Sequence, residues 1–195
     1  LREAKEAFFD HGEKSPLIRP EVEESWLRCM EAGMKRSGEV PERLTNGDLK
    51  ALKKRYGYFI HTARPIMREC LDNALEGVLL PLVMYITDAE GNVLDMECTN
   101  EFTLEAVRRL GMHVGSKWNE ENIGTNAVSL AIRHKKNFVT TAYEHYQEEH
   151  EFINCVSALI HDNDGNIIGT LTISYIRTYY NPLLTSLVCS VAEQI

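Results

Sequence analysis

The stretch YITDAEGNVLD (residues 85–95) places apolar and β-branched residues on both sides of Gly91 and Asn92. Gly and Asn tolerate the positive φ angles that tight turns require, so this stretch predicts two antiparallel strands joined by a hairpin turn. The stretch LIHDNDGNIIG (159–169) repeats the pattern, with Ile, Asp and Gly-Asn at matching positions. The two hairpins predict strands at 78–87 and 92–97, and at 156–160 and 166–175.

Helical and extended patterns alternate between the two hairpins. A helix is predicted at about 101–110, where Gly111 supplies a C-terminal stop, and another at about 125–134. A further strand is predicted at 137–141. Hairpins at both ends with helices between them are typical of an antiparallel sheet covered by helices, so the predicted fold class is α+β.

Residues 1–33 predict two helices separated by the sequence SPLIRP (15–20). Pro20 suits the first turn of the second helix, and Gly33 suits its C-terminal stop. With the polar stretch that follows, these helices make up a predicted N-terminal helical extension at 1–47. The apolar face of the second helix would consist of Val22, Trp26, Cys29 and Met30.

A long entry helix is predicted at 48–75, with Asp48 as its N-terminal cap. Pro65 removes a backbone donor inside this helix and predicts a kink or two abutting helices. The apolar stripe fits two interpretations equally well, a seam between two copies of the chain or a face packed on the helix's own domain. The stripe consists of Leu49, Leu52, Tyr56, Phe59, Ala63, Ile66 and Cys70.

A C-terminal helix is predicted at 182–195, where Asn181 and Pro182 provide the start. Because its apolar pattern is still running at Ile195, and because the chain begins at Leu1, we expect a truncated helix and a piece of a longer protein. The predicted domain thus covers 48–195. One apolar stripe of the last helix is Leu183, Leu187, Val191 and Ile195, and its neighbour is Leu184, Val188 and Ala192.

The composition favours a cytoplasmic domain that does not bind DNA directly. The 195 residues suffice for one domain with a core. Lys and Arg total 21 against 29 Asp and Glu, a net charge of −8, and no basic block is present to bind phosphates. No apolar run of about 18 residues and no signal peptide occur, so no membrane partner is expected. The five cysteines are scattered without a C-x-x-C pair, which argues against a disulfide framework.

Two acidic motifs raise the question of a metal site. DNDGN (162–166) resembles a calcium loop, but Gly165 comes too early and Ile173 stands where the loop needs its final acid, so a hairpin turn is favoured. EHYQEEHE (144–151) places His145 and His150 five residues apart, which misses the spacing that brings two histidines to one face of a helix. A solvated acidic surface is therefore expected there. No nucleotide-binding loop is present, and no cofactor or metal is predicted.

The stretch WNEENIGTNA (118–127) is the strongest candidate for a site. Thr125 or Asn126 at a helix start leaves backbone N–H groups free for a ligand oxygen, with Trp118 as an apolar wall. Alternatively, Thr125 only caps the helix while Glu120 or Glu121 holds the loop in place. The residues by themselves support both interpretations equally.

Five motifs occur in a recognisable order: SWLRCMEAG (25–33), YITDAEGNVLD, GSKWNEENIGTNAVSLAI (115–132), EHY (144–146) and CVSALIHDNDGNIIGTLTIS (155–174). In this order they resemble the N-terminal sensory region of σ54-dependent transcriptional activators of the acetoin and glycerol catabolism regulator type. The resemblance covers residues from about 25 to 195. It implies a GAF domain, with a six-stranded antiparallel sheet flanked by helices and a small-molecule pocket between the sheet and its covering loops.

In that family an AAA+ ATPase and a helix-turn-helix domain follow this region, and neither is in this chain. Leu159 departs from the pattern, because many relatives have proline there. Cys155 could line the pocket, bind iron as in nitric-oxide-sensing GAF domains, or belong to the core, and the core is favoured. The residues that match the family pattern are Trp118, Glu120, Gly124, Thr125, Asn126, His145 and Cys155. The predicted ligand-binding residues are Trp118, Glu120, Glu121, Thr125, Asn126, His145 and Cys155.

The resemblance implies a homodimeric, non-enzymatic module that binds a small-molecule effector and controls the adjacent ATPase. Two alternatives remain. One is a ligand-free dimerisation module, and the other is a GAF-type reductase that uses cysteines to reduce free methionine sulfoxide. The reductase requires an accessible thiol of low pKa with a resolving partner, and the wide cysteine spacing indicates no such pair.

Overall fold

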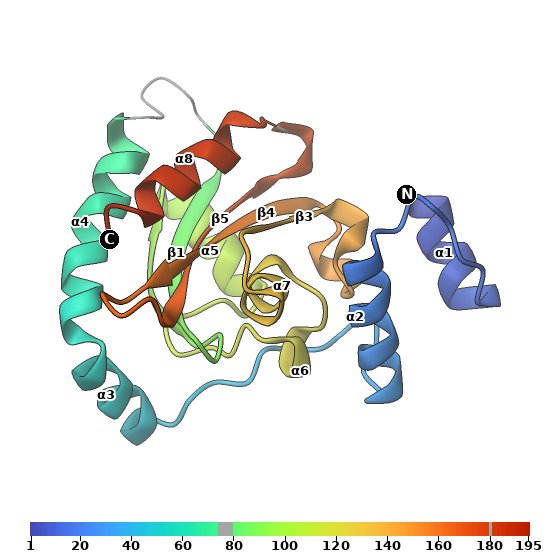
Figure 1. Cartoon of the computed structure of the whole chain (residues 1–195), viewed down its shortest axis with the longest axis horizontal. Helices are drawn as coiled ribbons and strands as arrows, with labels where there is room; N and C mark the ends of the chain where they lie inside the picture. Colours follow the sequence, from blue (N-terminus) through green and yellow to red (C-terminus); the bar gives the residue numbers. More distant parts are fainter. Residues whose placement is uncertain (74–79, 180) are drawn as a thin grey trace.

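A computed structural model of the chain describes residues 1–73, 80–179 and 181–195 (Figure 1). Its centre is a five-stranded antiparallel sheet in the order β2-β1-β5-β4-β3. The strands are β1 (Leu82–Asp88), β2 (Val93–Cys98), β3 (Phe138–Thr141), β4 (Ile153–His161) and β5 (Ile167–Ile176). The α+β class and both predicted hairpins are confirmed. The predicted start of β1 at 78 and 79 lies outside the described residues.

The two hairpin turns are built alike. Asp88 accepts hydrogen bonds from the backbone N–H (2.8 Å) and side-chain amide (2.8 Å) of Asn92, and Asp162 accepts the same pair from Asn166. The intervening Gly91 has a φ of 80°. The Asp side chain thus stabilises each turn by accepting hydrogen bonds from residues of the same turn. The DNDGN stretch is therefore a hairpin turn, as favoured from the sequence.

The expected sixth strand is replaced by an irregular segment. Residues 115–118 run beside the start of β2, where the Gly115 N–H donates to the Val93 carbonyl (2.7 Å) and the Val93 N–H donates to that of Ser116 (2.9 Å). Only isolated bridges form there. Gly115 has a φ of 88°, which lies far from the extended conformation, so the segment does not continue as a strand.

Helices α4 (Gly57–Asn73) and α8 (Leu183–Ala192) cover one face of the sheet, and α5 (Glu101–Arg109) and α7 (Ala127–His134) cover the other. Even-numbered residues of β1 pack on α4 and α8, as the two-residue period of a strand requires. The second predicted stripe of α8, Leu184, Val188 and Ala192, is buried in the core. Of the first stripe, Val191 is also buried, whereas Leu183 is 71% exposed. No helix of the described ranges is both long and apolar enough to span a bilayer.

The predicted entry helix is two helices, and they meet away from the proline. α3 (Asn46–Arg55) ends at Tyr56, and Pro65 lies inside α4. Thr45 caps α3 by accepting the Asp48 N–H at 3.2 Å, so the helix begins before the predicted cap. The apolar stripe packs on the sheet of its own domain. Residues 74 and 75 of the predicted helix lie outside the described residues.

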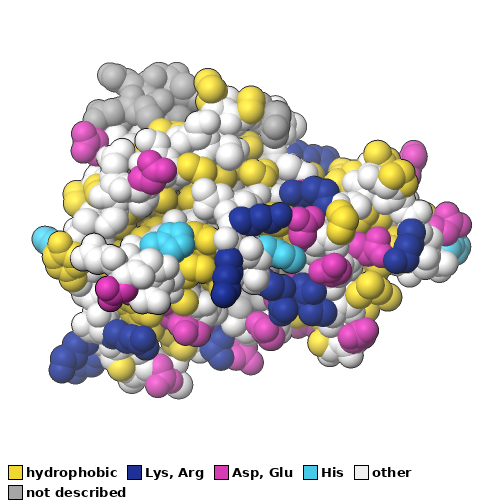
Figure 2. Space-filling view, in the orientation of Figure 1, with side chains coloured by type: hydrophobic (Ala, Val, Ile, Leu, Met, Phe, Trp, Pro, Cys, Tyr) yellow, Lys and Arg dark blue, Asp and Glu magenta, His cyan; other side chains and the backbone are white. Residues whose placement is uncertain are grey.

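The N-terminal extension contains α1 (Arg2–His11) and α2 (Pro20–Glu31), as predicted, at the end of the molecule opposite α4 (Figure 1). Val22, Trp26 and Cys29 of α2 are buried as predicted, whereas Met30, which was predicted on the same face, is 43% exposed. On the face in Figure 2, basic and acidic side chains are interspersed. An ion pair between Lys136 and Glu21 (2.6 Å) links the extension to the domain.

Candidate functional site

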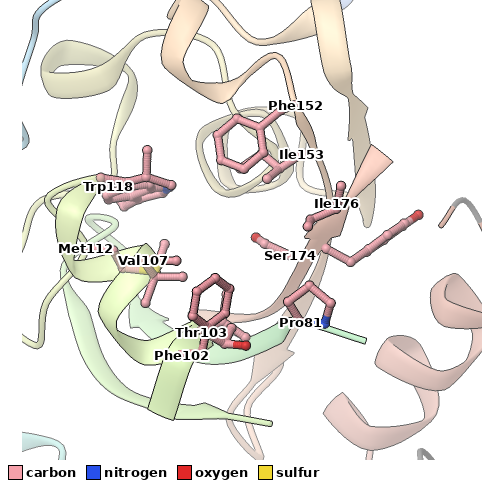
Figure 3. A pocket seen from close by; sticks show the side chains of 14 residues that line it. Pro81, Phe102, Thr103, Val107, Met112, Trp118, Phe152, Ile153, Ser174 and Ile176 are labelled. Atoms are coloured by element: carbon pink, nitrogen blue, oxygen red, sulfur yellow. The ribbon is translucent and has the colours of Figure 1, made fainter. Parts of the chain in front are cut away.

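A largely apolar cavity of about 90 Å³ lies between one end of the sheet and α5 (Figure 3). Asn100 starts α5 by accepting the Thr103 N–H at 2.8 Å, and Gly111, with a φ of 80°, turns the chain back after the helix. The apolar wall includes Phe102, Val107, Met112, Phe152, Ile153 and Ile176. The lining therefore comes from α5, the loop after it, the residues before and within β4, and β5.

Two polar groups of the described residues face this cavity and could form a hydrogen bond with a ligand. The indole nitrogen of Trp118 lies on the cavity side of the ring, and the Ser174 hydroxyl points inward from β5 (Figure 3). The Ser174 oxygen is 3.1 Å from the sulfur of Cys155, and the Thr103 hydroxyl already donates to Asn100 at 3.0 Å. No charged side chain of the described residues lines the cavity. It can thus hold an apolar body and hydrogen-bond one or two oxygens.

Trp118 is placed by the first hairpin. Its backbone N–H donates to the Gly91 carbonyl at 2.7 Å, and a side chain at Gly91 would approach Asn119 to 3.2 Å. The His150 ring packs against the indole with centroids 5.5 Å apart. Trp118 is the one predicted ligand-binding residue that lines the cavity.

Glu120 holds the N-terminal extension to the domain. Its carboxylate accepts two hydrogen bonds from Arg28 at 2.7 and 2.9 Å and one from the Ser25 hydroxyl, and Arg133 lies 3.4 Å away. Burial raises the pKa of Glu120, but hydrogen bonds from Arg28 and Ser25 outweigh that effect, so the pKa lies below its ordinary value. The carboxylate therefore remains charged and serves as an ionic link.

Glu120→Ala is expected to lower the free energy of unfolding by about 2 kcal/mol, because it leaves Arg28 without its bidentate partner. Glu120→Gln keeps the shape and should recover part of the loss. Chemical denaturation of both variants measures the difference. A Glu120→Ala variant as stable as the wild type would contradict the structural role of this carboxylate.

The neighbouring residues are also engaged within the chain. Asn126 starts α7, since its side chain accepts the Ser129 N–H at 3.1 Å, in a capping box. The Thr125 hydroxyl is 2.7 Å from that of Ser25, and Glu121 is exposed on the outer surface. None of Glu121, Thr125 and Asn126 lines the cavity, and ligand binding by these residues stays a prediction.

His145 and His150 were expected on a solvated acidic surface, and this expectation is wrong. Both rings are buried, with centroids 6.0 Å apart, because the segment between β3 and β4 folds inward as two short 3-10 helices, η1 (Ala142–Glu144) and η2 (Glu148–His150). Burial lowers the pKa of His145 to about 3 and that of His150 to about 4. The described residues contain no group of three or more His, Cys, Asp or Glu side chains that could hold a metal.

Cys155 lies on β4 beside Ser174 and is buried, as favoured from the sequence. Burial raises the pKa of its thiol to about 12, and the pKa values of Cys29 and Cys98 also rise, to about 11. None of these three thiols has the low pKa that a nucleophilic or redox-active cysteine needs.

Ser174 and the aromatic residues Phe102 and Phe152 were missed from the sequence. A signal for Ser174 was present, because Thr170, Thr172 and Ser174 alternate with apolar residues along a strand that is buried on both faces. Nothing in the sequence indicated the two phenylalanines, since they come from segments 50 residues apart that only the fold brings together.

Comparison with known proteins gives relatives of one functional class. The chain is 28% identical over 176 residues to the acetoin dehydrogenase operon transcriptional activator AcoR of Bacillus subtilis. It is also 28% identical over 157 residues to the acetoin catabolism regulatory protein of Cupriavidus necator. These matches cover 90% and 78% of this chain but only 28% and 23% of the relatives, so the chain spans about a quarter of their length.

Among solved structures, the crystal structure of the Escherichia coli DhaR(N)–DhaL complex contains a similar fold. It matches with a TM-score of 0.79 at 22% identity, over 90% of this chain and 58% of the other. The family model described as GAF domain matches residues 61–195, from within α4 to the end of α8 and beyond. That match covers the whole sheet and the cavity, and the chain therefore belongs to the GAF domain family.

Proposed function

We propose that this chain is the effector-binding region of a bacterial σ54-dependent transcriptional activator, and that its effector controls an adjacent AAA+ ATPase. The GAF family match and the relatives, which are named as transcriptional regulators, support a regulatory role. The cavity beneath α5 is the observation that carries the binding proposal. The effector would bind one arrangement of the surrounding elements better than another, since equal affinity would shift no equilibrium.

The size of the cavity selects a small effector. An engineered cavity of roughly 150 Å³ holds benzene, so the cavity of about 90 Å³ suits a molecule that is no larger than benzene. Its wall is dominated by side chains such as Val107, Met112 and Ile176, which favour methyl or methylene groups.

The absence of charged side chains among the described lining residues favours a neutral effector. A carboxylate or ammonium group would lose its hydration there without meeting an opposite charge, which is strongly unfavourable. Trp118 N–H and the Ser174 hydroxyl could instead donate to a carbonyl or hydroxyl oxygen. Acetoin, which the names of two relatives mention, combines two methyl groups with one carbonyl and one hydroxyl. A small neutral hydroxyketone or alcohol of this kind is the proposed effector.

Calorimetric titration with acetoin, butane-2,3-diol, glycerol and acetate tests this assignment. Acetoin or the diol should bind more tightly than glycerol, and acetate should not bind. Trp118→Phe and Ser174→Ala each remove one donor and should weaken binding by about 1 kcal/mol, or about fivefold. Asn126→Ala is the matched control, because it removes a helix cap outside the cavity and should lower stability without changing affinity.

Other results would favour the other functions. Binding of none of these compounds would remove the proposal and favour a ligand-free dimerisation module. Weakened binding in Asn126→Ala but not in Trp118→Phe would move the site to the WNEENIGTNA helix start. The raised pKa values of Cys29, Cys98 and Cys155 give no support to a cysteine-based reductase.

A further inference from the structure

The ammonium group of Lys5 is buried in a position where it touches the domain rather than solvent. Lys5 lies on α1, and its side chain is 1% exposed. Its Nζ atom donates to the carbonyls of His145 (2.7 Å) and Tyr146 (3.3 Å) and to the carboxylate of Glu151 (2.7 Å). All three ammonium protons can therefore be used, and all three acceptors belong to one short segment.

That segment, residues 142–152, is here called the roof segment. Its inner side closes the cavity, since Phe152 lines the cavity and the His150 ring packs on Trp118. Two histidines on it are buried, so the segment has little freedom to move while it is docked. A shift of the C-terminal end of the segment would move Phe152 and so change the cavity wall.

The outer side of the roof segment is held by the N-terminal extension at several further points. The Trp26 indole N–H donates to the Glu144 carbonyl at 3.0 Å, and Arg19 donates twice to the Glu144 carboxylate at 2.6 and 2.8 Å. The Tyr146 hydroxyl donates to the Met34 carbonyl at 2.9 Å. The extension thus contacts the roof segment at Glu144 and Tyr146, and Phe152 at the end of the same segment lines the cavity.

Lys5 differs from these other contacts in its sequence position. It is on the first helix, which is separated from α2 by residues 12–19, and it reaches both ends of the roof segment at once. Phe9 of the same helix packs on Tyr146 with ring centroids 5.6 Å apart. α1 is also docked by its apolar face, because Phe8 and Phe9 pack on Trp26, and the Lys5 ammonium supplies the polar contacts to the roof segment.

We infer that Lys5 is a positioning residue for the effector cavity, and that docking of α1 and binding of the effector stabilise each other. This inference rests on the proposed function, because it assigns a regulatory role to the wall of the same cavity. A ligand that binds only when the roof segment is docked must, by linkage, favour the docked position of α1. The N-terminal helix then reports cavity occupancy to whatever it contacts outside the domain.

The test uses Lys5→Met, which keeps the length of the side chain and removes its charge. Hydrogen exchange of backbone amides is measured first, without ligand. Exchange should accelerate at least tenfold within 142–152 and leave β5 unchanged, because the sheet does not depend on this contact. Acetoin is then used as the probe, and its affinity should fall about fivefold to tenfold. Saturating acetoin should also slow exchange in α1 of the wild type.

Lys14→Met is the matched control on the same extension, since Lys14 is exposed and pairs with Glu23 of α2. It should leave exchange in 142–152 and acetoin affinity unchanged. Glu151→Gln keeps an acceptor for Lys5 and should give an intermediate effect, which guards against a Lys5→Met variant that fails to fold. A merely structural Lys5 would accelerate exchange in β5 as much as in the roof segment.

The outcomes separate this inference from the proposed function. Unchanged exchange at 142–152 in Lys5→Met would overturn the inference whatever the ligand results. Faster local exchange with unchanged acetoin affinity would also overturn it, because the roof position would then not be linked to binding. If wild-type protein binds neither acetoin nor the diol, the proposed function fails, and the positioning role of Lys5 is judged by local exchange alone.

Discussion

Lowering the pH from 7 to 5 is expected to reduce the free energy of unfolding by about 4 kcal/mol, of which His145 and His150 contribute about 2 kcal/mol each. Burial holds the pKa values of these rings at about 3 and about 4, well below the ordinary value of 6.5. The His150 ring also lowers the pKa of His145, and the Lys5 ammonium lowers the pKa values of both rings. In the opposite direction, the Ala142 carbonyl raises the pKa of His145 and Glu149 raises that of His150.

The sign follows from proton binding. Between pH 6.5 and about 4 the unfolded chain protonates both histidines and the folded chain protonates neither, so stability falls as the pH falls. Carboxylates with lowered pKa, such as Glu120, act mainly below about pH 4.5, so the two buried histidines dominate the interval from pH 7 to 5. The lowered pKa of His113 acts in the same direction, and the raised pKa of Asp88 acts in the opposite one.

Denaturation midpoints in urea, measured at half-unit steps of pH, give this dependence. His145→Asn keeps a donor for the Ala142 carbonyl, which accepts from the ring at 2.9 Å, and removes one titrating group, so the slope should fall by about half. His161→Asn, at an exposed histidine, is the control. A wild-type stability that is flat between pH 7 and 5 would show that the rings are not held neutral.

Gly124→Ala is expected to lower the free energy of unfolding by about 4 kcal/mol. Under conditions in which the wild-type protein is only marginally stable, the variant should not fold. Gly124 has a φ of 71° and a ψ of −159°, a conformation that essentially only glycine adopts. A Cβ atom there would also lie 2.6 Å from the Cβ of Tyr146. Tyr146 is fully buried and its backbone N–H donates to the Thr125 carbonyl at 3.2 Å, so it cannot move aside.

The control for Gly124→Ala is Gly12→Ala. Gly12 ends α1 with a φ of 69°, and a Cβ atom there would meet nothing within 4 Å. Gly12→Ala should lower the free energy of unfolding by only about 1 kcal/mol, because alanine adopts the left-handed conformation less easily than glycine. Thermal unfolding of both variants checks the comparison. Equal losses at the two positions would mean that contact with Tyr146 contributes nothing.

Local patterns in the sequence were sufficient for most elements of the fold. The repeated Asp and Gly-Asn spacing predicted both hairpins, because an Asp side chain closes such a turn without help from distant residues. The helix end at Gly111 and the helix start near Asn126 were also predicted from the sequence, because helix caps likewise depend on residues close together in the chain. The break between α3 and α4 was misplaced, since a proline is accommodated inside α4 and the chain bends at Tyr56 instead.

The site was less accessible to prediction, because its parts are joined only by packing. Trp118 lines the cavity, but ligand binding by this residue stays a prediction. Glu120 looked the same in sequence whether it bound a ligand or an arginine, and only the approach of Arg28, 92 residues away, distinguishes the two.

The sequence by itself thus determined the hairpins, the capped helices and the family, since turns, caps and periodic burial depend on residues close together in the chain. The tertiary structure decided which side chains are buried together: the histidine pair, the Lys5 contacts and the cavity with Ser174 and Phe152. Burial and partners at long sequence separation set charge state, pKa and shape, and these quantities exist only once the chain has folded.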